Sequence, residues 1–204
     1  MPTLENIKDV WKKQVDCKYK FSKEELFEMM HLKSSSAVKW ILIISILEFI
    51  IPNVLLLFSD YKGTIEFYHK YELTGIMEVY FAIHFVIILY FIYRFYKNYK
   101  NISAEQSVKE LMENIIQTRK TVKYYIYYNI AIAGVIGVHI FYRVFHSEVF
   151  LEQLPEDANM TTIWIMALVI FGFVLFLFWV VYRIIYGFLL RRLKLNYREL
   201  KKTE

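Results

Sequence analysis

The fold is decided by residues 162–190, which have the sequence TIWIMALVIFGFVLFLFWVVYRIIYGFLL. Arg183 is the only charged residue in this stretch, and a helix needs about 20 predominantly apolar residues to cross a bilayer. Three further runs are long and apolar, at residues 38–58, 73–95 and 124–145. The whole chain is 57% hydrophobic, above the roughly 45–50% apolar content of soluble proteins. We therefore predict an all-α fold, a transmembrane bundle of four helices.

Basic residues predict the orientation, because Lys and Arg close to a span are retained on the cytoplasmic side. Residues 1–39 carry eight lysines, residues 97–123 carry six basic residues and residues 191–204 carry another six. Residues 59–72 carry only two, and residues 146–161 carry none. We therefore predict that both termini are cytoplasmic. The net charge of +5 then reflects topology and attraction to anionic lipid rather than nucleic-acid binding.

The chain divides into cytoplasmic and spanning segments. The first 37 residues lack the apolar core and cleavage site of a secretory signal, so we expect no removal of the N-terminus and insertion by the first span. The predicted segments are a cytoplasmic helical segment at 1–37, spans at 38–58, 73–95, 124–145 and 162–190, a cytoplasmic helical loop at 96–123 and a basic cytoplasmic tail at 191–204.

The cytoplasmic segments have the pattern of amphipathic helices. Ser22 to Glu25 matches a capping box, and we predict a second capping box at Ser103 to Gln106. Such apolar faces pack into a bundle continuous with the spans, lie in the lipid headgroups or bind a protein partner. The candidate partner-binding residues are Leu4, Ile7, Val10, Trp11, Leu26, Phe27, Met30, Val108, Leu111 and Ile115.

Ionisable side chains inside the spans are the candidates for chemistry, since Asp, Lys or Arg near the centre of a span costs about 2.5–3.5 kcal/mol. They are Glu48, Glu78, His84, His139 and Arg143. A rise of about 1.5 Å per residue places Glu48 and His84 near the middle of the bilayer, with Glu78 and Arg143 in the outer half. We predict that Glu48 pairs with His84, and Glu78 with Arg143 or His139.

A functional interpretation of these pairs remains open. Carboxylate and imidazole groups together relay protons or ligate zinc or iron. The chain has no HExxH motif, no dense array of acidic residues and no repeated histidine spacing, which favours structural pairs with no metal and no cofactor.

Weaker signals concern helix shape and contact. Pro52 and Asn53 are expected to open the first span near its outer end, where Asn129 would help to satisfy the freed carbonyls. Gly134 and Gly137 allow a close helix contact. A cluster of tyrosines is typical of a membrane-interface belt; its members are Tyr124, Tyr125, Tyr127 and Tyr128.

Soluble catalysis is not indicated. The sequence contains no GxSxG, P-loop or GxGxxG motif. The single cysteine, Cys17, excludes an intrachain disulfide. We therefore expect a protein that is not an enzyme.

Three stretches carry a resemblance to a known group of proteins. They are Leu4 to Gln14 (LENIKDVWKKQ), Lys33 to Ile41 (KSSSAVKWI) and Tyr186 to Lys202 (YGFLLRRLKLNYRELKK). The chain resembles small four-span inner-membrane proteins of flavobacteria, often encoded beside an extracytoplasmic-function sigma factor. The resemblance implies a location in a bacterial inner membrane and a role as a membrane-bound anti-sigma factor.

Two classes of function follow as hypotheses. The first is a regulatory protein whose cytoplasmic helices bind a protein partner, such as a sigma factor, in a groove of that partner. The second is a small transporter or lipid-site protein that uses the intramembrane Glu, His and Arg side chains. An accessory subunit of a larger membrane complex, or a homodimer, is a third arrangement, because the fourth span suits burial against a membrane protein as well as lipid.

Overall fold

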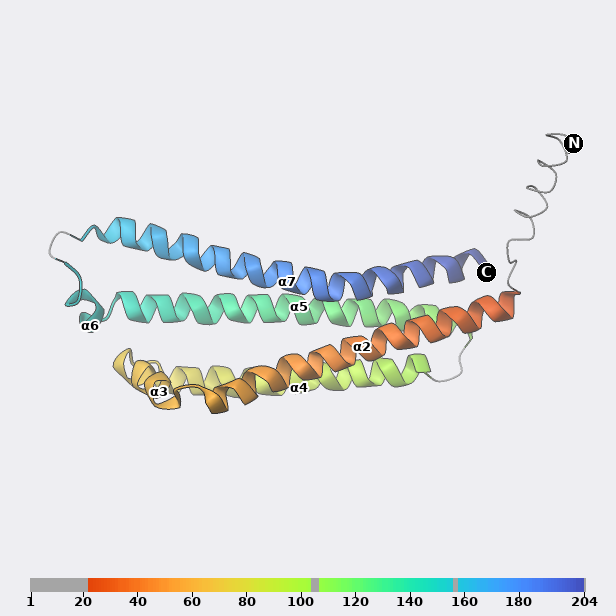
Figure 1. The fold of residues 1–204 in the computed structure, drawn as a ribbon, viewed down its shortest axis with the longest axis horizontal. Helices are drawn as coiled ribbons and strands as arrows, with labels where there is room; N and C mark the ends of the chain where they lie inside the picture. Colours follow the sequence, from red (N-terminus) through yellow and green to blue (C-terminus); the bar gives the residue numbers. More distant parts are fainter. Residues whose placement is uncertain (1–21, 104–106, 156–157, 204) are drawn as a thin grey trace, which may run out of the picture.

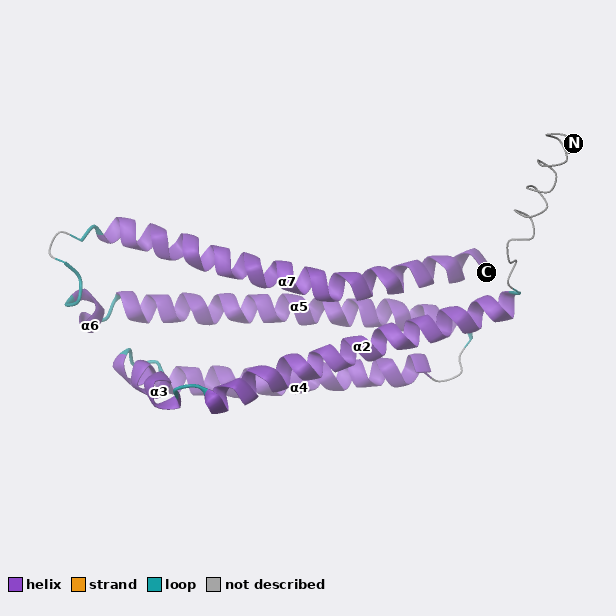
Figure 2. Cartoon of the chain, viewed as in Figure 1, coloured by secondary structure: helices purple, strands orange, loops and turns teal. Residues whose placement is uncertain are grey.

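The computed structural model describes residues 22–103, 107–155 and 158–203, and the described residues form helices and no strands (Figure 2). Four helices are long and apolar enough to cross a membrane, which confirms the predicted all-α bundle of four spans. The helices are α2 (Lys23–Phe58), α3 (Tyr61–Lys70), α4 (Thr74–Ser103), α5 (Val108–Phe145), α6 (Glu148–Leu151) and α7 (Met160–Thr203).

The four long helices run up and down in chain order (Figure 1). α2 packs against α4 and α7, and α5 packs against the same two helices. Each helix therefore lies between two antiparallel neighbours, an arrangement typical of four-helix bundles. The short helices α3 and α6 lie together at one end of the bundle, and the start of α2 and the end of α7 lie at the other (Figure 1).

Two capping boxes begin the helices on the same side of the bundle. The Ser22 hydroxyl accepts from the Glu25 amide and the Glu25 carboxylate accepts from the Ser22 amide, as predicted. The box predicted at Ser103 is wrong, because Ser103 is the last residue of α4. Ser107 and Glu110 form the capping box of α5 instead, with the same spacing.

The helices pass through the predicted segment boundaries without a break. α2 joins the predicted cytoplasmic segment to the first span, and α7 joins the fourth span to the basic tail. The loop predicted at residues 59–72 instead contains α3, whose first turn is capped by Asp60 accepting from the Gly63 amide at 3.1 Å. The long helices α2 and α7 therefore extend beyond the apolar spans.

One end of the bundle, the tight end, has a closely packed core. It consists of residues 23–45, 88–103, 108–125 and 186–201 and holds the main cluster of buried side chains, to which all four long helices contribute. Polar side chains in this core bond one another: Asn196 Nδ2 donates to Ser34 Oγ at 3.0 Å. The apolar faces predicted for these segments thus pack into a bundle continuous with the spans.

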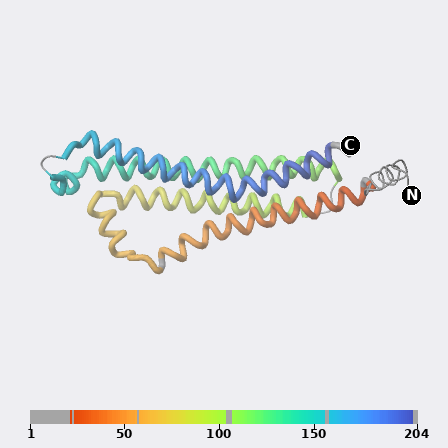
Figure 3. Tube along the Cα trace, turned by 45° about the horizontal axis from the view of Figure 1, so that its top comes forward, coloured from red at the N-terminus to blue at the C-terminus, as the bar shows by residue number. Residues whose placement is uncertain are grey.

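The other end, the open end, has few buried side chains. It consists of residues 46–58, 74–87, 126–145 and 160–182, where most apolar side chains are exposed on the outer surface. α2 diverges from the other helices towards its C-terminal end (Figure 3). Such a continuous apolar exterior is what lipid covers in a membrane protein.

Candidate functional site

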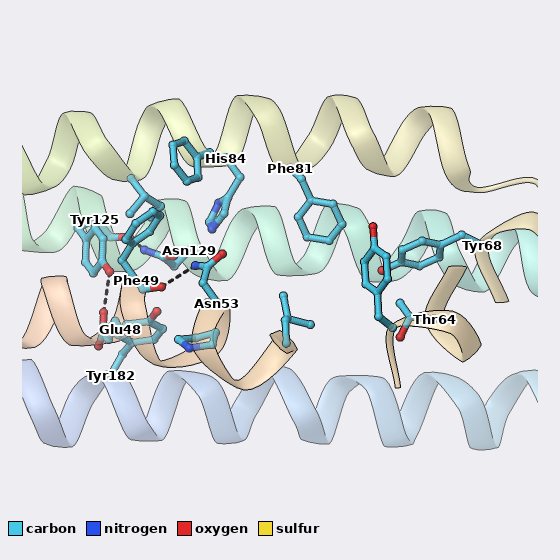
Figure 4. Close-up of a pocket in the computed structure, with 15 residues that line it drawn as sticks. Glu48, Phe49, Asn53, Thr64, Tyr68, Phe81, His84, Tyr125, Asn129 and Tyr182 are labelled. Carbon is cyan, nitrogen blue, oxygen red and sulfur yellow. Dashed lines mark hydrogen bonds between the residues drawn. The ribbon is translucent and has the colours of Figure 1, made fainter. Parts of the chain in front are cut away.

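Glu48 lies where the tight end meets the open end. Its Oε2 accepts hydrogen bonds from the Tyr125 hydroxyl at 2.6 Å and from the Tyr186 hydroxyl at 3.0 Å. These three residues, here called the Glu48 node, come from α2, α5 and α7. Both tyrosine side chains are almost fully buried. The node therefore joins three helices through a single carboxylate oxygen. Figure 4 shows the bond between Tyr125 and Glu48.

Aromatic packing fixes the direction of the Tyr125 hydroxyl. The Tyr125 ring meets the edges of Phe91 and Phe95 on α4, with ring centroids 5.4 Å apart in both cases. It also meets Tyr186 at 5.9 Å, and Tyr182 stacks on Tyr186. Edge-on aromatic contacts of this kind contribute about 0.5–1.5 kcal/mol beyond area burial. These ring contacts hold the Tyr125 side chain so that its hydroxyl points at the Glu48 carboxylate.

A cavity of about 450 Å³ opens directly beside the Glu48 node, enclosed by α2, α3, α4, α5 and α7. Its walls are mainly apolar and aromatic, and a few polar side chains point into it (Figure 4). The lining residues are Glu48, Phe49, Pro52, Asn53, Leu56, Tyr61, Thr64, Tyr68, Phe81, His84, Phe85, Ile88, Tyr125, Asn129 and Tyr182.

A second cavity of about 240 Å³ lies deeper in the open end, between α4, α5 and α7. The two cavities share Phe81, His84, Asn129 and Tyr182 as walls. The two cavities are therefore neighbours, and these four side chains form part of the wall of each.

Pro52 explains why α2 leaves room for the cavity. Proline has no amide hydrogen, so it cannot donate to the carbonyl of Glu48 four residues earlier, and its ring bends the helix. Asn53 Nδ2 donates to the Phe49 carbonyl at 2.6 Å. The predicted opening of the span is not seen as a break, because α2 continues past Pro52 and Asn53 to Phe58. The predicted help from Asn129 is wrong, because Asn129 Nδ2 donates to the Tyr125 carbonyl of its own helix at 2.8 Å.

Three acceptor oxygens of the cavity lining are not used by the described hydrogen bonds, and the hydroxyls of Tyr61, Tyr68 and Tyr182 also line it. The described hydrogen bonds use Oε2 of Glu48 and the amide nitrogens of Asn53 and Asn129. Oε1 of Glu48 and Oδ1 of both asparagines accept none from the described residues. His84 Nδ1 bonds the Tyr128 hydroxyl at 3.2 Å, and the two rings stack.

The predicted intramembrane pairs are wrong. Glu48 bonds Tyr125 and Tyr186 rather than His84, although Glu48 and His84 line the same cavity. Arg143 pairs with the Glu72 carboxylate and donates to the Glu72 carbonyl at 3.1 Å.

The remaining members of those pairs lie apart from each other. Glu78 is exposed on α4. The His139 ring lies edge-on to Tyr80, and the buried Nε2 of His139 has no partner in the described residues. Helix tilt and rotation, which the sequence does not specify, decide which side chains meet.

The candidate partner-binding residues divide by burial. Leu4, Ile7, Val10 and Trp11 lie outside the described residues. Met30, Leu111 and Ile115 are buried in the core of the tight end. Leu26, Phe27 and Val108 are half-buried against the same core. A partner would have to separate the chain's own helices to reach Met30, Leu111 and Ile115. The binding of a protein partner such as a sigma factor stays a prediction.

The two tyrosines of the node were not predicted as site residues. Tyr124 and Tyr127 are each 65% exposed, as an interface belt requires, but Tyr125 is 2% exposed and bonds Glu48. The signal was available in the helical period: Tyr125, Tyr128 and Asn129 share one face of α5, and Tyr124 and Tyr127 point elsewhere. Within the described residues, no cluster of His, Cys, Asp and Glu is arranged to hold a metal ion.

Gly137 confirms the predicted close helix contact. A Cβ atom at this position would overlap the ring of Phe171 on α7. The Phe171 ring also meets Phe141 edge-on, with centroids 5.2 Å apart. At the open end, α7 therefore approaches α5 through a glycine.

One protein family, described as a domain of unknown function (DUF8845), matches residues 24–204. No curated protein and no solved structure matches the chain. The family match covers all four long helices and carries no function with it.

Proposed function

We propose that this chain, which belongs to the DUF8845 family, is a membrane protein that binds an amphipathic molecule in the cavity beside Glu48. The observation that carries the proposal is a bonded carboxylate at one side of a cavity of about 450 Å³ with aromatic walls. Ligand sites are commonly cavities of about 300–1,000 Å³ with apolar walls and a few placed polar groups.

The position of the cavity supports entry from the lipid. Several of its wall residues are also exposed on the apolar exterior: Leu56 is 52% exposed, Phe81 51% and Phe85 48%. A molecule dissolved in hydrocarbon thus meets the rim of the cavity without crossing water. Transport across the membrane would need a second opening, so the proposal is limited to binding.

The cost of the Glu48 node favours a role in binding. A carboxylate within a span is expensive, and such residues are usually functional. A purely structural link between α2, α5 and α7 needs only neutral hydroxyls or amides, as at Ser34 and Asn196. The chain instead places an ionisable carboxyl group beside the cavity.

Fluorescence binding of 1-pyrenemethanol, a neutral aromatic alcohol, tests the proposal with the protein in phosphatidylcholine nanodiscs. Asn129→Phe fills the space that both cavities share, and we expect affinity to fall at least tenfold. Val135→Phe adds the same ring on the exterior of the same helix, where Val135 is 52% exposed, and should change nothing. Equal affinities for the two variants, or no saturable binding to the wild type, would refute the proposed function.

We also propose that the tight end faces the cytoplasm of a bacterial cell and that the chain lies in the inner membrane. The support is the excess of basic residues in the segments that form or follow this end, against their scarcity in the connections at α3 and α6. The variants Ser36→Cys and Gln153→Cys, both at exposed positions, test the orientation. A membrane-impermeant maleimide applied to intact cells should label Gln153→Cys and not Ser36→Cys; the opposite result would reverse the topology.

A further inference from the structure

We infer that the ligand of this cavity is a lipophilic ammonium ion, a molecule with an apolar aromatic or alkyl body and one N–H-bearing cationic group. The inference rests on the proposed function and adds the chemical class of the ligand. It follows from the unused hydrogen-bonding atoms of the cavity, the charges around it and the nature of its walls.

Three unused oxygens beside the Glu48 node are acceptors only. Both tyrosine hydroxyls of the node donate to Oε2 of Glu48, which leaves Oε1 without a donor among the described residues. The side-chain nitrogens of Asn53 and Asn129 donate to backbone carbonyls, which leaves their two side-chain oxygens without a donor among the described residues. A ligand that brings N–H donors satisfies these oxygens, whereas a ligand with only acceptors leaves them unpaired in a mainly apolar site, which is unfavourable.

Among the described residues, no Lys or Arg lies in the walls around Glu48. The ion pair that the structure shows in its described residues joins Arg143 to Glu72, away from these cavities. A charged carboxylate in such surroundings needs a partner of opposite sign, and a cationic ligand supplies it.

The walls suit a cation with an apolar body. Phe49 and Phe85 meet edge-on with centroids 5.1 Å apart, and Phe81, Tyr125 and Tyr182 add further rings. Aromatic faces attract ammonium groups, most strongly when the cation is desolvated. The same rings bury the apolar part of the ligand, so one cavity serves both parts of an amphipathic cation.

A matched pair of ligands tests the inference. 1-Pyrenemethylamine is protonated at neutral pH and has the same ring system as 1-pyrenemethanol, so the two differ in the cationic group. We expect the amine to bind the wild type in phosphatidylcholine nanodiscs at least tenfold more tightly than the alcohol. Glu48→Gln should remove this preference. Glu78→Gln removes an exposed carboxylate from another span and should keep it.

A second variant tests the same site independently, in case Glu48→Gln fails to fold. Asn53→Leu removes one free acceptor and retains Glu48, and it should reduce the preference for the amine over the alcohol three- to tenfold. Alcohol binding without a preference for the amine would overturn the inference and leave the proposed function standing. Binding of neither ligand would overturn both, and an amine preference that survives in both Glu48→Gln and Asn53→Leu would overturn the assigned site.

The ammonium group has two natural sources, a free lipophilic amine and the headgroup of phosphatidylethanolamine. Nanodiscs that contain phosphatidylethanolamine distinguish them. If the headgroup occupies the site, these discs weaken amine binding to the wild type and not to Glu48→Gln. If a free amine is the ligand, the affinity is unchanged. Either result supports an ammonium site, provided that the amine preference is present.

Discussion

The Glu48 node makes a quantitative prediction about stability. Tyr125→Phe removes a buried hydroxyl that donates to a carboxylate at 2.6 Å and leaves the ring packing intact. Hydrogen bonds to charged groups contribute about 1.5–3 kcal/mol in soluble proteins, whereas side-chain bonds between helices of a membrane protein average about 0.6 and reach about 1.7 kcal/mol. Because this bond is short, buried and made to a carboxylate, we expect a loss of about 1–2 kcal/mol.

The assay is equilibrium unfolding in mixed micelles with increasing sodium dodecyl sulfate, followed by far-ultraviolet circular dichroism. Tyr127→Phe is the control, because it removes the same atom from an exposed ring on the same helix, and it should cost less than about 0.5 kcal/mol. A double-mutant cycle of Tyr125→Phe with Glu48→Gln should give a coupling energy of about 1 kcal/mol. A cost for Tyr125→Phe no larger than the control, or a coupling energy within about 0.3 kcal/mol of zero, would refute the role assigned to the node.

Two further predictions concern helix packing. Gly137→Ala puts a methyl group against the ring of Phe171 and should cost about 1–3 kcal/mol by overpacking in the same unfolding assay; Gly172→Ala, with nothing within 4 Å, is the control, and equal effects would exclude the close contact. Ser34→Ala leaves the Asn196 amide buried without its acceptor and should lower stability by about 1–3 kcal/mol, measured as a lower thermal midpoint; an unchanged midpoint would contradict the buried bond.

The sequence was sufficient for the fold, because hydropathy and capping are local signals. The run at residues 162–190 requires a membrane-spanning helix by length alone. The spacing of Ser22 and Glu25 marked the start of α2 to the residue. The same signal existed at Ser107 and Glu110, but the neighbouring serine at position 103 matched the pattern equally well. Local patterns therefore located helices better than they located every boundary.

The site was only partly predictable, because it depends on how helices are rotated and tilted against one another. Glu48 was recognised as a costly intramembrane carboxylate, and it does belong to the site. Its partners were not recognised, since depth counted along separate helices matched Glu48 to His84, whereas the packed bundle places it against Tyr125 and Tyr186. One residue along a helix shifts a side chain by about 1.5 Å and about 100°, so small errors of register exchange one partner for another.

Photoaffinity labelling tests the central claim most directly, namely that the cavity beside Glu48 binds an amphipathic molecule. A diazirine derivative of 1-pyrenemethanol is cross-linked to the protein in nanodiscs, and the labelled peptides are mapped by mass spectrometry. We expect labels within residues 48–56 of α2 and 81–88 of α4, suppressed by excess 1-pyrenemethanol. Labels spread over the exposed face of α7 at residues 165–170, with no suppression by the competitor, would contradict the account.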